Sequence, residues 1–399
     1  MRSTDPAMAA EGRVLALVGG LVYTAPGSPP LVDGVVLTVG EEITAVGPRS
    51  RVEIPAGSTV IDVSGKSVLP AFWNSHVHLT EPKWAGIDTM AAQPASALVM
   101  EMFTRFGFVH VIDIGSFPDV TLALRKRISS GEVPGPNIMT ALTPFVPPSG
   151  TPRYVAPLVL PELRTDGAAR DSVRVRVAQG ADVIKVFAVS ITDAQPFPAM
   201  DPSVIQALTD EAHRAGRRVF AHPTDLRGVQ LAVRNGVDIL AHTAPMAGDF
   251  PDSVVAAMRE RDVALIPTLT LWEVELARDT LGARKFIQYG QGQVRAHFGR
   301  GGRVLFGTDV GYIAHYDPTR EYELMSGAGL DFDAILASLT TAPAEEFGQA
   351  DRTGRLAPGL GADIVVVDGN PAADIRVLGR VDLTLKRGRV LYSAAQASL

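Results

Sequence analysis

The sequence contains no cysteine among its 399 residues. This absence excludes disulfide scaffolds, iron–sulfur clusters, thiolate zinc sites and cysteine nucleophiles. Any bound metal must therefore be held by histidine, carboxylate or a less usual ligand. Long hydrophobic runs are also missing, since residues 14–18 are followed by two glycines and are too short for a signal peptide or a membrane span. We expect a soluble, cytoplasmic protein that does not bind membranes.

Basic residues do not predominate either. The chain has 37 Lys and Arg against 43 Asp and Glu, a net charge of −6, which argues against a nucleic-acid-binding protein. Hydrophobic residues make up 46% and charged residues 20%, so the chain is globular and has material for a large core. The composition fits a protein whose partner is a small-molecule substrate.

The two ends of the chain resemble each other and differ from the middle. Short β-type runs punctuated by Gly, Pro and Asp occupy residues 13–70 and return in residues 354–399. Neither end is large enough to bury a good core alone. We therefore expect residues 1–70 and 354–399 to pair as one small composite β-sandwich domain, with the rest of the chain inserted between them.

The middle of the chain alternates between apolar runs and amphipathic helical stretches. Eight runs recur about every 30 residues, the length of one βαβ unit. Near-continuous apolar runs are typical of parallel strands buried on both faces. The fold class is therefore α/β, a (β/α)8 TIM barrel over residues 71–353; a doubly wound sheet is the competitor, without a Gly-rich phosphate loop to support it. The runs are residues 68–78, 108–115, 137–142, 182–188, 218–222, 237–242, 263–268 and 304–309.

Two histidines close the first run. His76 and His78 are separated by one residue, so in a β-strand both side chains point to the same face. This spacing lets two imidazoles share one ion. The carboxyl ends of the strands, where these residues fall, carry the active site in a (β/α)8 barrel. The alternative is a pair of exposed or hydrogen-bonded histidines.

A lysine lies inside the fourth run. Lys185 is surrounded by apolar residues of the segment 183–187, and burying its charge costs several kcal/mol unless the charge is removed or paired. Reaction of the amine with CO2 would convert the cation into an anionic carbamate, which bridges two cations as a carboxylate does. The alternative is that the side chain extends past the strand end into solvent.

Three further polar residues end apolar runs. His222 and His242 close the fifth and sixth runs, and Asp309 closes the eighth. Taken singly, each histidine is compatible with a buried structural role and Asp309 with a helix N-cap. Together with the histidine pair and the lysine, they form a set of six candidate ligands on predicted strands, which indicates a metal site.

At this point the chain resembles the amidohydrolase superfamily. The lysine on the fourth strand is similar to that of the group containing imidazolonepropionase-like proteins and Xaa-Pro dipeptidases. One departure is Asn74, which stands where the family often has an aspartate; by alternation it shares the inward face with His76. The matching segments are residues 65–70, 75–79, 183–187, 220–223, 240–243, 306–309 and 359–366.

The resemblance implies a binuclear centre. His76, His78 and Asp309 would hold the more buried metal ion. His222 and His242 would hold the second ion. The resemblance also suggests a homo-oligomer.

The resemblance further implies the chemistry. Carboxylated Lys185 would bridge the two divalent ions, for which Zn2+ is the default and Mn2+ and Co2+ are alternatives. A hydroxide between the ions would be the nucleophile, and the ions would polarise the scissile carbonyl. Asp309 would take the hydroxide proton and pass it to the leaving nitrogen.

Several reactions are compatible with this site. The leading hypothesis is cleavage of an amide C–N bond in a dipeptide, an N-acyl amino acid or an aryl amide. Lactone or ester hydrolysis would use the same two ions. A mononuclear deaminase is a further alternative, although such sites usually have a glutamate shortly after the fifth-strand histidine, where this chain has Pro223-Thr224-Asp225. A non-catalytic scaffold is the last.

Residues in the loops after the strands are candidates for substrate contact. Arg153 would bind a carboxylate and Tyr154 would donate to a carbonyl oxygen. His315 follows Asp309 in the loop over the site, and Trp84 and Trp272 follow the first and seventh strands, so each is a candidate pocket residue. Ordinary packing or a solvated loop is the alternative for all five. Asp113 is a candidate partner of a histidine ligand.

Overall fold

A computed structural model describes residue 12 and residues 14–397 of the chain. Residues 1–11, 13, 398 and 399, which belong to the predicted composite domain, lie outside the described residues. No helix of the described part is long and apolar enough to cross a membrane.

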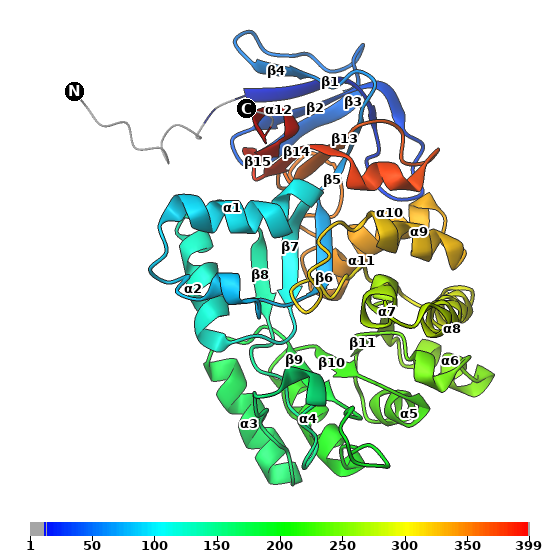
Figure 1. The fold of residues 1–399 in the computed structure, drawn as a ribbon. Helices are drawn as coiled ribbons and strands as arrows, with labels where there is room; N and C mark the ends of the chain where they lie inside the picture. Colours follow the sequence, from blue (N-terminus) through cyan, green and yellow to red (C-terminus); the bar gives the residue numbers. More distant parts are fainter. Residues whose placement is uncertain (1–11, 13, 398–399) are drawn as a thin grey trace.

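Strands from both ends of the chain lie in one sheet (Figure 1). The order is β15-β14-β13-β5-β1-β2-β3, with β4 pairing beside β1. The antiparallel pairing of β5 with β13 joins the two ends. All eight strands therefore belong to one hydrogen-bonded sheet, and the sandwich form of the composite domain stays a prediction. The strands are β1 (Val14–Val22), β2 (Leu31–Val39), β3 (Glu42–Pro48), β4 (Thr59–Asp62), β5 (Ser67–Pro70), β13 (Ile364–Val367), β14 (Val381–Lys386) and β15 (Arg389–Ser393).

The middle of the chain carries two parallel sheets. One has the order β6-β7-β8 and the other β12-β11-β10-β9. Isolated parallel bridges link Phe145 to Val186, Leu265 to Val304, and Val77 to Val310, between the edges of these sheets. The strands are β6 (Phe72–Val77), β7 (Phe108–Asp113), β8 (Asn137–Thr140), β9 (Ile184–Phe187), β10 (Val219–His222), β11 (Ile239–Leu240) and β12 (Ala264–Leu265).

The last two predicted strands are shorter or less regular than expected. Residues 263–268 contain only the two-residue β12, and residues 304–309 contain only an isolated bridge. Pro267 lacks an N–H for a ladder, and Thr268 and Asp309 have left-handed φ values of 44° and 62° that bend the chain out of a strand. The 303–310 segment still hydrogen-bonds to β12 and β6 on its two sides.

Helices surround the parallel sheets (Figure 1). Aspartates, which are preferred helix N-caps, precede two of these helices: the carboxylates of Asp201 and Asp331 accept from Ser203 N and Ala334 N at 2.9 Å each. The helices are α1 (Ala92–Met102), α2 (Pro118–Ser129), α3 (Asp166–Ala178), α4 (Pro202–Arg214), α5 (Leu226–Arg234), α6 (Asp252–Glu260), α7 (Leu269–Glu275), α8 (Thr280–Phe298), α9 (Thr319–Gly327), α10 (Phe332–Leu339), α11 (Thr341–Glu346) and α12 (Ala394–Ala397). Short 3-10 helices occur at Pro82–Trp84, Thr104–Phe106, Arg153–Val155, Pro245–Ala247 and Ile375–Gly379.

Buried polar contacts join the sheet of the chain ends to the central part. His110 Nε2 on β7 lies 3.1 Å from Asp363 Oδ2, and the His110 ring stacks on Trp73 with centroids 4.3 Å apart. Thr384 Oγ1 donates to the Thr104 carbonyl at 2.7 Å. These contacts lie at the amino ends of β6 and β7, away from the histidines at the carboxyl end of β6.

Candidate active site

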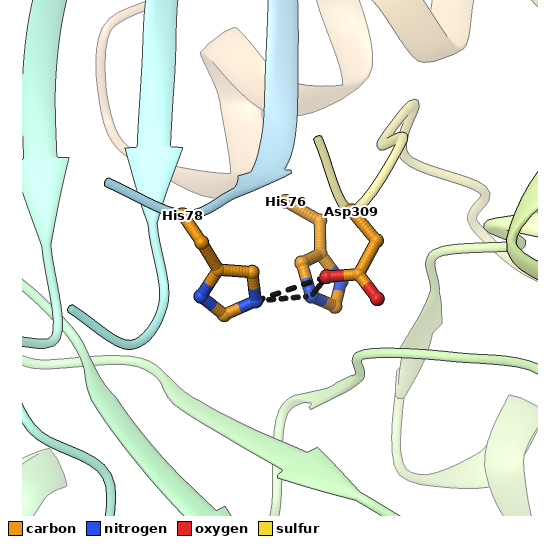
Figure 2. Close-up of side chains that lie close together, drawn as sticks. All are labelled: His76, His78 and Asp309. Carbon is orange, nitrogen blue, oxygen red and sulfur yellow. Dashed lines mark hydrogen bonds and ion pairs between the residues drawn. The ribbon is translucent and has the colours of Figure 1, made fainter. Parts of the chain in front are cut away.

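Three predicted ligands converge at the carboxyl end of β6 (Figure 2). Asp309 Oδ1 lies 3.0 Å from His76 Nε2 and 2.9 Å from His78 Nε2. The two Nε2 atoms are 3.3 Å apart. His76 and Asp309 are buried, and His78 is partly buried. One ligand atom from each residue lies within 4.8 Å of the others, so the three side chains form a compact group of the kind that holds a metal ion.

Backbone carbonyls fix the tautomers of both histidines. His76 Nδ1 lies 2.7 Å from the Ala241 carbonyl and His78 Nδ1 lies 2.6 Å from the Gly115 carbonyl. Because a carbonyl oxygen only accepts, both Nδ1 atoms carry the proton, and each neutral ring presents its Nε2 lone pair. Two nitrogen lone pairs and a carboxylate oxygen therefore face one another, an arrangement that a cation satisfies. The residues fit a divalent metal ion.

The pKa shifts of the three residues reflect how closely these groups lie together. Burial lowers the pKa of His76 to about 4. Burial also acts to lower the pKa of His78, but the hydrogen bond and charge of Asp309 outweigh it and raise the pKa. Burial acts to raise the pKa of Asp309, but the neighbouring histidines hold it well below its usual range. Asp309 is therefore an anion at neutral pH.

Asp309 owes its position to the irregular backbone of the 303–310 segment. Its N–H donates to the His76 carbonyl at 2.9 Å, and His78 N donates to the Val310 carbonyl at 2.8 Å. Its φ of 62° is in the left-handed region, which Asp tolerates better than most residues. The departure from regular strand geometry thus turns the carboxylate toward the two histidines of β6.

Asn74 holds the same segment against β6. Its Nδ2 donates to Thr308 Oγ1 at 2.8 Å, and its Oδ1 accepts from Thr308 N at 3.2 Å and His76 N at 3.3 Å. The side chain is fully buried. Asn74 therefore fixes the backbone of the segment that carries Asp309. The sequence placed the Asn74 side chain on the inward face but did not define its role.

Asp113 supports His78 indirectly. Its Oδ1 accepts from Ser116 Oγ at 2.5 Å and from Gly115 N at 3.2 Å, and its Oδ2 accepts from Thr121 Oγ1 at 2.7 Å. These bonds fix the loop whose Gly115 carbonyl accepts from His78 Nδ1. Within the described residues Asp113 makes no direct hydrogen bond to a histidine. It acts on His78 through the loop backbone and through its charge, which contributes to the raised pKa of His78.

The other two histidines continue a row of imidazoles. The His242 ring centroid lies 4.4 Å from that of His76 and 4.7 Å from that of His222. His222 stacks on Phe187, with centroids 4.8 Å apart. Burial is the main cause that lowers the pKa of both His222 and His242 well below the usual value, so both rings are neutral. They lie beside the compact three-residue group, not within it.

Lys185 lies on β9 with only 3% of its surface exposed. Within the described part of the chain its Nζ has no hydrogen-bond or ion-pair partner, and it lies 5.8 Å from the centroid of the Phe187 ring. Burial lowers its pKa to about 7, against an opposing effect of Asp309. A neutral amine is the form that attacks CO2, so this environment suits carbamate formation.

The predicted substrate-contact residues have different environments. Trp84 is fully buried in the main hydrophobic core, an environment that favours the packing alternative over a place in the pocket. Trp272 Nε1 donates to Thr243 Oγ1 at 3.1 Å, with its indole centroid 6.5 Å from that of His242. The Arg153 side chain is largely exposed, and its Nη1 lies 3.7 Å from Asp193 Oδ1. His315 is also exposed.

Tyr154 belongs to an aromatic pair that the sequence did not reveal. Its ring lies edge-on to Tyr312, with centroids 5.4 Å apart. Burial raises the pKa of Tyr312, with added effects from the charge and hydrogen bond of Glu275 and the charge of Asp309. Tyr312 was missed because it lies in a loop, where the sequence gives no spacing rule.

The sequence model of a protein family, described as the amidohydrolase family, matches residues 67–391. The chain belongs to the amidohydrolase family. The family predicted from the strand-end motifs is thereby confirmed, and this amidohydrolase is a hydrolytic enzyme.

Relatives of the amidohydrolase include ochratoxinase of Aspergillus niger, which is 26% identical over 92% of this chain and 84% of the relative. A crystal structure of a prolidase complexed with N-methylphosphonate-L-proline is similar, with a TM-score of 0.78 and 25% identity over 94% of this chain and 99% of the other. A Xaa-Pro dipeptidase structure shares the fold, with a TM-score of 0.80 and 21% identity over 96% and 100% of the two chains.

Proposed function

We propose that this amidohydrolase cleaves an amide C–N bond of a small substrate at a binuclear metal centre. His76, His78 and Asp309 would hold one divalent ion, and His222 and His242 the other. The observation that carries the proposal is the convergence of two lone-pair-bearing Nε2 atoms and the Asp309 carboxylate within 4.8 Å.

Lys185 would complete the centre as a carbamate bridge. The support is its burial on β9 without a polar partner, within electrostatic reach of Asp309. The charge of Lys185 also acts on both His222 and His242. A protonated amine placed among candidate ligands would repel a metal ion, whereas a carbamate would attract it.

The residues of the chain divide the chemistry in a simple way. Two bound divalent ions would lower the pKa of a water molecule and would polarise the carbonyl of the substrate. Asp309, an anion at neutral pH, would accept the proton of the attacking water and deliver it to the leaving nitrogen. Tyr154, whose ring contacts that of Tyr312 in the loop after Asp309, would donate a hydrogen bond to the substrate carbonyl oxygen.

The substrate class we propose is a dipeptide, an N-acyl amino acid or an aryl amide. The relatives named ochratoxinase and prolidase, at 26% and 25% identity, support amide cleavage over the lactone, ester and deamination alternatives. Arg153, on the loop beside Tyr154, would bind a substrate carboxylate. Zinc as the metal, a homo-oligomeric assembly and a cytoplasmic location stay predictions from the sequence.

We further propose that residues 71–353 form a (β/α)8 barrel and that the two chain ends form a separate β-domain. The three isolated bridges connect every open edge of the two parallel sheets. One buried apolar cluster draws on residues from successive strands around this circuit, including Ile112, Phe220 and Leu305. Such a shared interior is expected of a barrel.

A substrate panel tests the proposed reaction. The protein, loaded with Zn2+ in bicarbonate buffer, would be incubated with X-Pro and other dipeptides, N-acyl amino acids, aryl amides, lactones and aminated heterocycles. We expect release of a primary or secondary amine from at least one amide class. Turnover of lactones alone, or release of ammonia from a heterocycle, would contradict the proposal and favour the corresponding alternative.

A further inference from the structure

A residue with a strained backbone directly precedes helix α7. Thr268, which directly precedes the helix, has φ 44° and ψ 49° and is fully buried. A β-branched residue in the left-handed region is a genuine outlier, and such a conformation persists only where the surroundings enforce it. Some contact of the surrounding structure must therefore hold this turn.

The strained residue touches a candidate metal ligand. Thr268 Oγ1 lies 2.8 Å from His242 Nδ1, and both side chains are buried. If His242 binds metal through Nε2, its Nδ1 carries the proton and donates to this hydroxyl. Trp272, one turn later on α7, lies edge-on to the same imidazole, with ring centroids 6.5 Å apart. The start of α7 therefore sets the orientation of the His242 ring.

A buried carboxylate on another helix holds the start of α7. Glu321, on α9, is 1% exposed. Its Oε1 accepts from Leu269 N at 2.8 Å, and its Oε2 accepts from Thr270 N at 2.7 Å and Thr270 Oγ1 at 2.8 Å. In the described residues it has no cationic partner, since the adjacent Arg320 pairs with Glu273 and Glu323.

We infer that Glu321 is a positioning residue for the metal site at His222 and His242. By binding the first two N–H groups after Thr268, it holds the left-handed turn that presents the threonine hydroxyl to His242. This inference rests on the proposed function, because it requires the second metal ion. Neither Glu321 nor Thr268 is assigned any role by the strand-end motifs.

The chemistry of one substitution makes the inference testable. In Glu321→Gln, one side-chain oxygen remains an acceptor, but the amide nitrogen faces an N–H donor of α7 and cannot accept from it. The turn then loses part of the hydrogen bonding that Glu321 provides. Thr268 relaxes out of the left-handed region toward a negative φ, and its hydroxyl moves away from His242. Partners of a ligating histidine typically contribute 10- to 100-fold in metal affinity.

Zinc titration of the metal-free protein by calorimetry is the experiment. We expect the wild type to bind two equivalents, and Glu321→Gln to bind one unchanged and the other about 10- to 100-fold more weakly. Glu273→Gln is the matched control: it removes a partly exposed carboxylate of α7 that pairs with Arg320, and should leave both affinities unchanged.

Thr268 provides a second pair of variants if Glu321→Gln does not fold. Thr268→Val keeps the shape and loses the hydroxyl, so it should weaken the same equivalent; Thr268→Ser keeps the hydroxyl and should restore wild-type binding. Hydrogen exchange at Leu269 and Thr270 in metal-free Glu321→Gln should be faster than in the wild type, which reports the lost hydrogen bonding to Glu321 without metal or activity.

The outcomes separate the two proposals. Two unchanged equivalents in both Glu321→Gln and Thr268→Val would overturn the positioning role and leave the binuclear centre intact. Faster exchange with unchanged zinc binding would mean that Glu321 stabilises only the helix, and would also overturn it. A single equivalent in the wild type would overturn the binuclear centre itself, together with the inference that depends on it.

Discussion

The Nε2 atom of His76 lies 3.3 Å from the Nε2 atom of His78, and in the neutral rings neither atom carries a proton. Each neutral ring donates its one N–H to a backbone carbonyl, that of Ala241 for His76 and that of Gly115 for His78. Two acceptors at hydrogen-bond distance repel each other unless a positive charge, either a proton or a metal ion, lies between them. The fold therefore builds a site in which a bound cation relieves a repulsion.

Metal removal should destabilise the folded protein. Zinc at 100 times its dissociation constant stabilises a folded state that binds it by about 3 kcal/mol. We expect a chelator to lower the Tm by several degrees and added zinc to restore it, as measured by differential scanning calorimetry. The shift should shrink in Asp309→Asn, which loses the carboxylate ligand. A Tm insensitive to both chelator and zinc would count against a metal at this site.

Replacement of Lys185 should abolish turnover. Lys185→Ala removes the proposed bridge, and we expect kcat to fall more than about 100-fold, beyond the loss typical of residues that only support a ligand. Formate or acetate should restore part of the activity, because a free carboxylate can occupy the place of the carbamate. Steady-state assays with and without these anions test this.

A second lysine gives the control for that experiment. Lys386, on β14, has its Nζ bound to the Gly135 carbonyl at 2.9 Å, outside the site. Lys386→Met should keep wild-type kcat. Full activity in Lys185→Ala would show that Lys185 is only a buried structural residue.

Asp113 should influence the metal without touching it. Asp113→Asn loses one acceptor oxygen, loosens the loop that carries the Gly115 carbonyl and frees the His78 ring. We expect metal affinity to fall about 10- to 100-fold with little change in KM. Competition with a chromophoric chelator measures the affinity, and Asp119→Asn, at the exposed start of α2, is the control. Equal metal affinities in Asp113→Asn and Asp119→Asn would show that Asp113 does not influence the metal site.

The stability of the protein should depend on pH through Glu321. Burial raises the pKa of Glu321 from 4.5 to about 7, against its hydrogen bonds to α7 and with a small added effect from Glu273. The folded state therefore binds this proton more tightly than the unfolded state, so the free energy of unfolding falls as pH rises from about 4.5 to 7. The full effect is a few kcal/mol.

Urea unfolding of metal-free wild type and Glu321→Gln at several pH values isolates this contribution. The wild type should lose stability relative to the variant between about pH 4.5 and 7, and the difference should level off above pH 7. A difference that stays constant over this range would show that Glu321 titrates normally. The control Glu273→Gln should change the wild-type slope only slightly, because the Glu273 charge is the last and smallest of the causes that set the Glu321 pKa.

The positions of the strand-end residues were predictable because they depend on local patterns. Alternation placed His76 and His78 on one face, and the roughly 30-residue repeat brought distant strand ends to the same edge. Asp201 and Asp331 were predictable as caps for the same reason, since a cap acts within one helical turn.

Features that depend on long-range or backbone contacts were not predictable. The carbonyls of Ala241 and Gly115 fix the histidine tautomers, yet a carbonyl has no signature in the sequence. The left-handed φ of Asp309 makes its segment irregular where a strand was expected. The contact of Glu321 with the start of α7 joins two helices through main-chain N–H groups, which any residues could supply.

Metal content per chain is the measurement that tests the central claim most directly. Protein purified without chelator, incubated with bicarbonate and divalent zinc and then freed of unbound metal, would be analysed by inductively coupled plasma mass spectrometry. We predict two equivalents per chain for the wild type and fewer for Lys185→Ala. Fewer than two equivalents in the wild type after this treatment would contradict the binuclear centre, and none would mean that the histidines at the strand ends are structural.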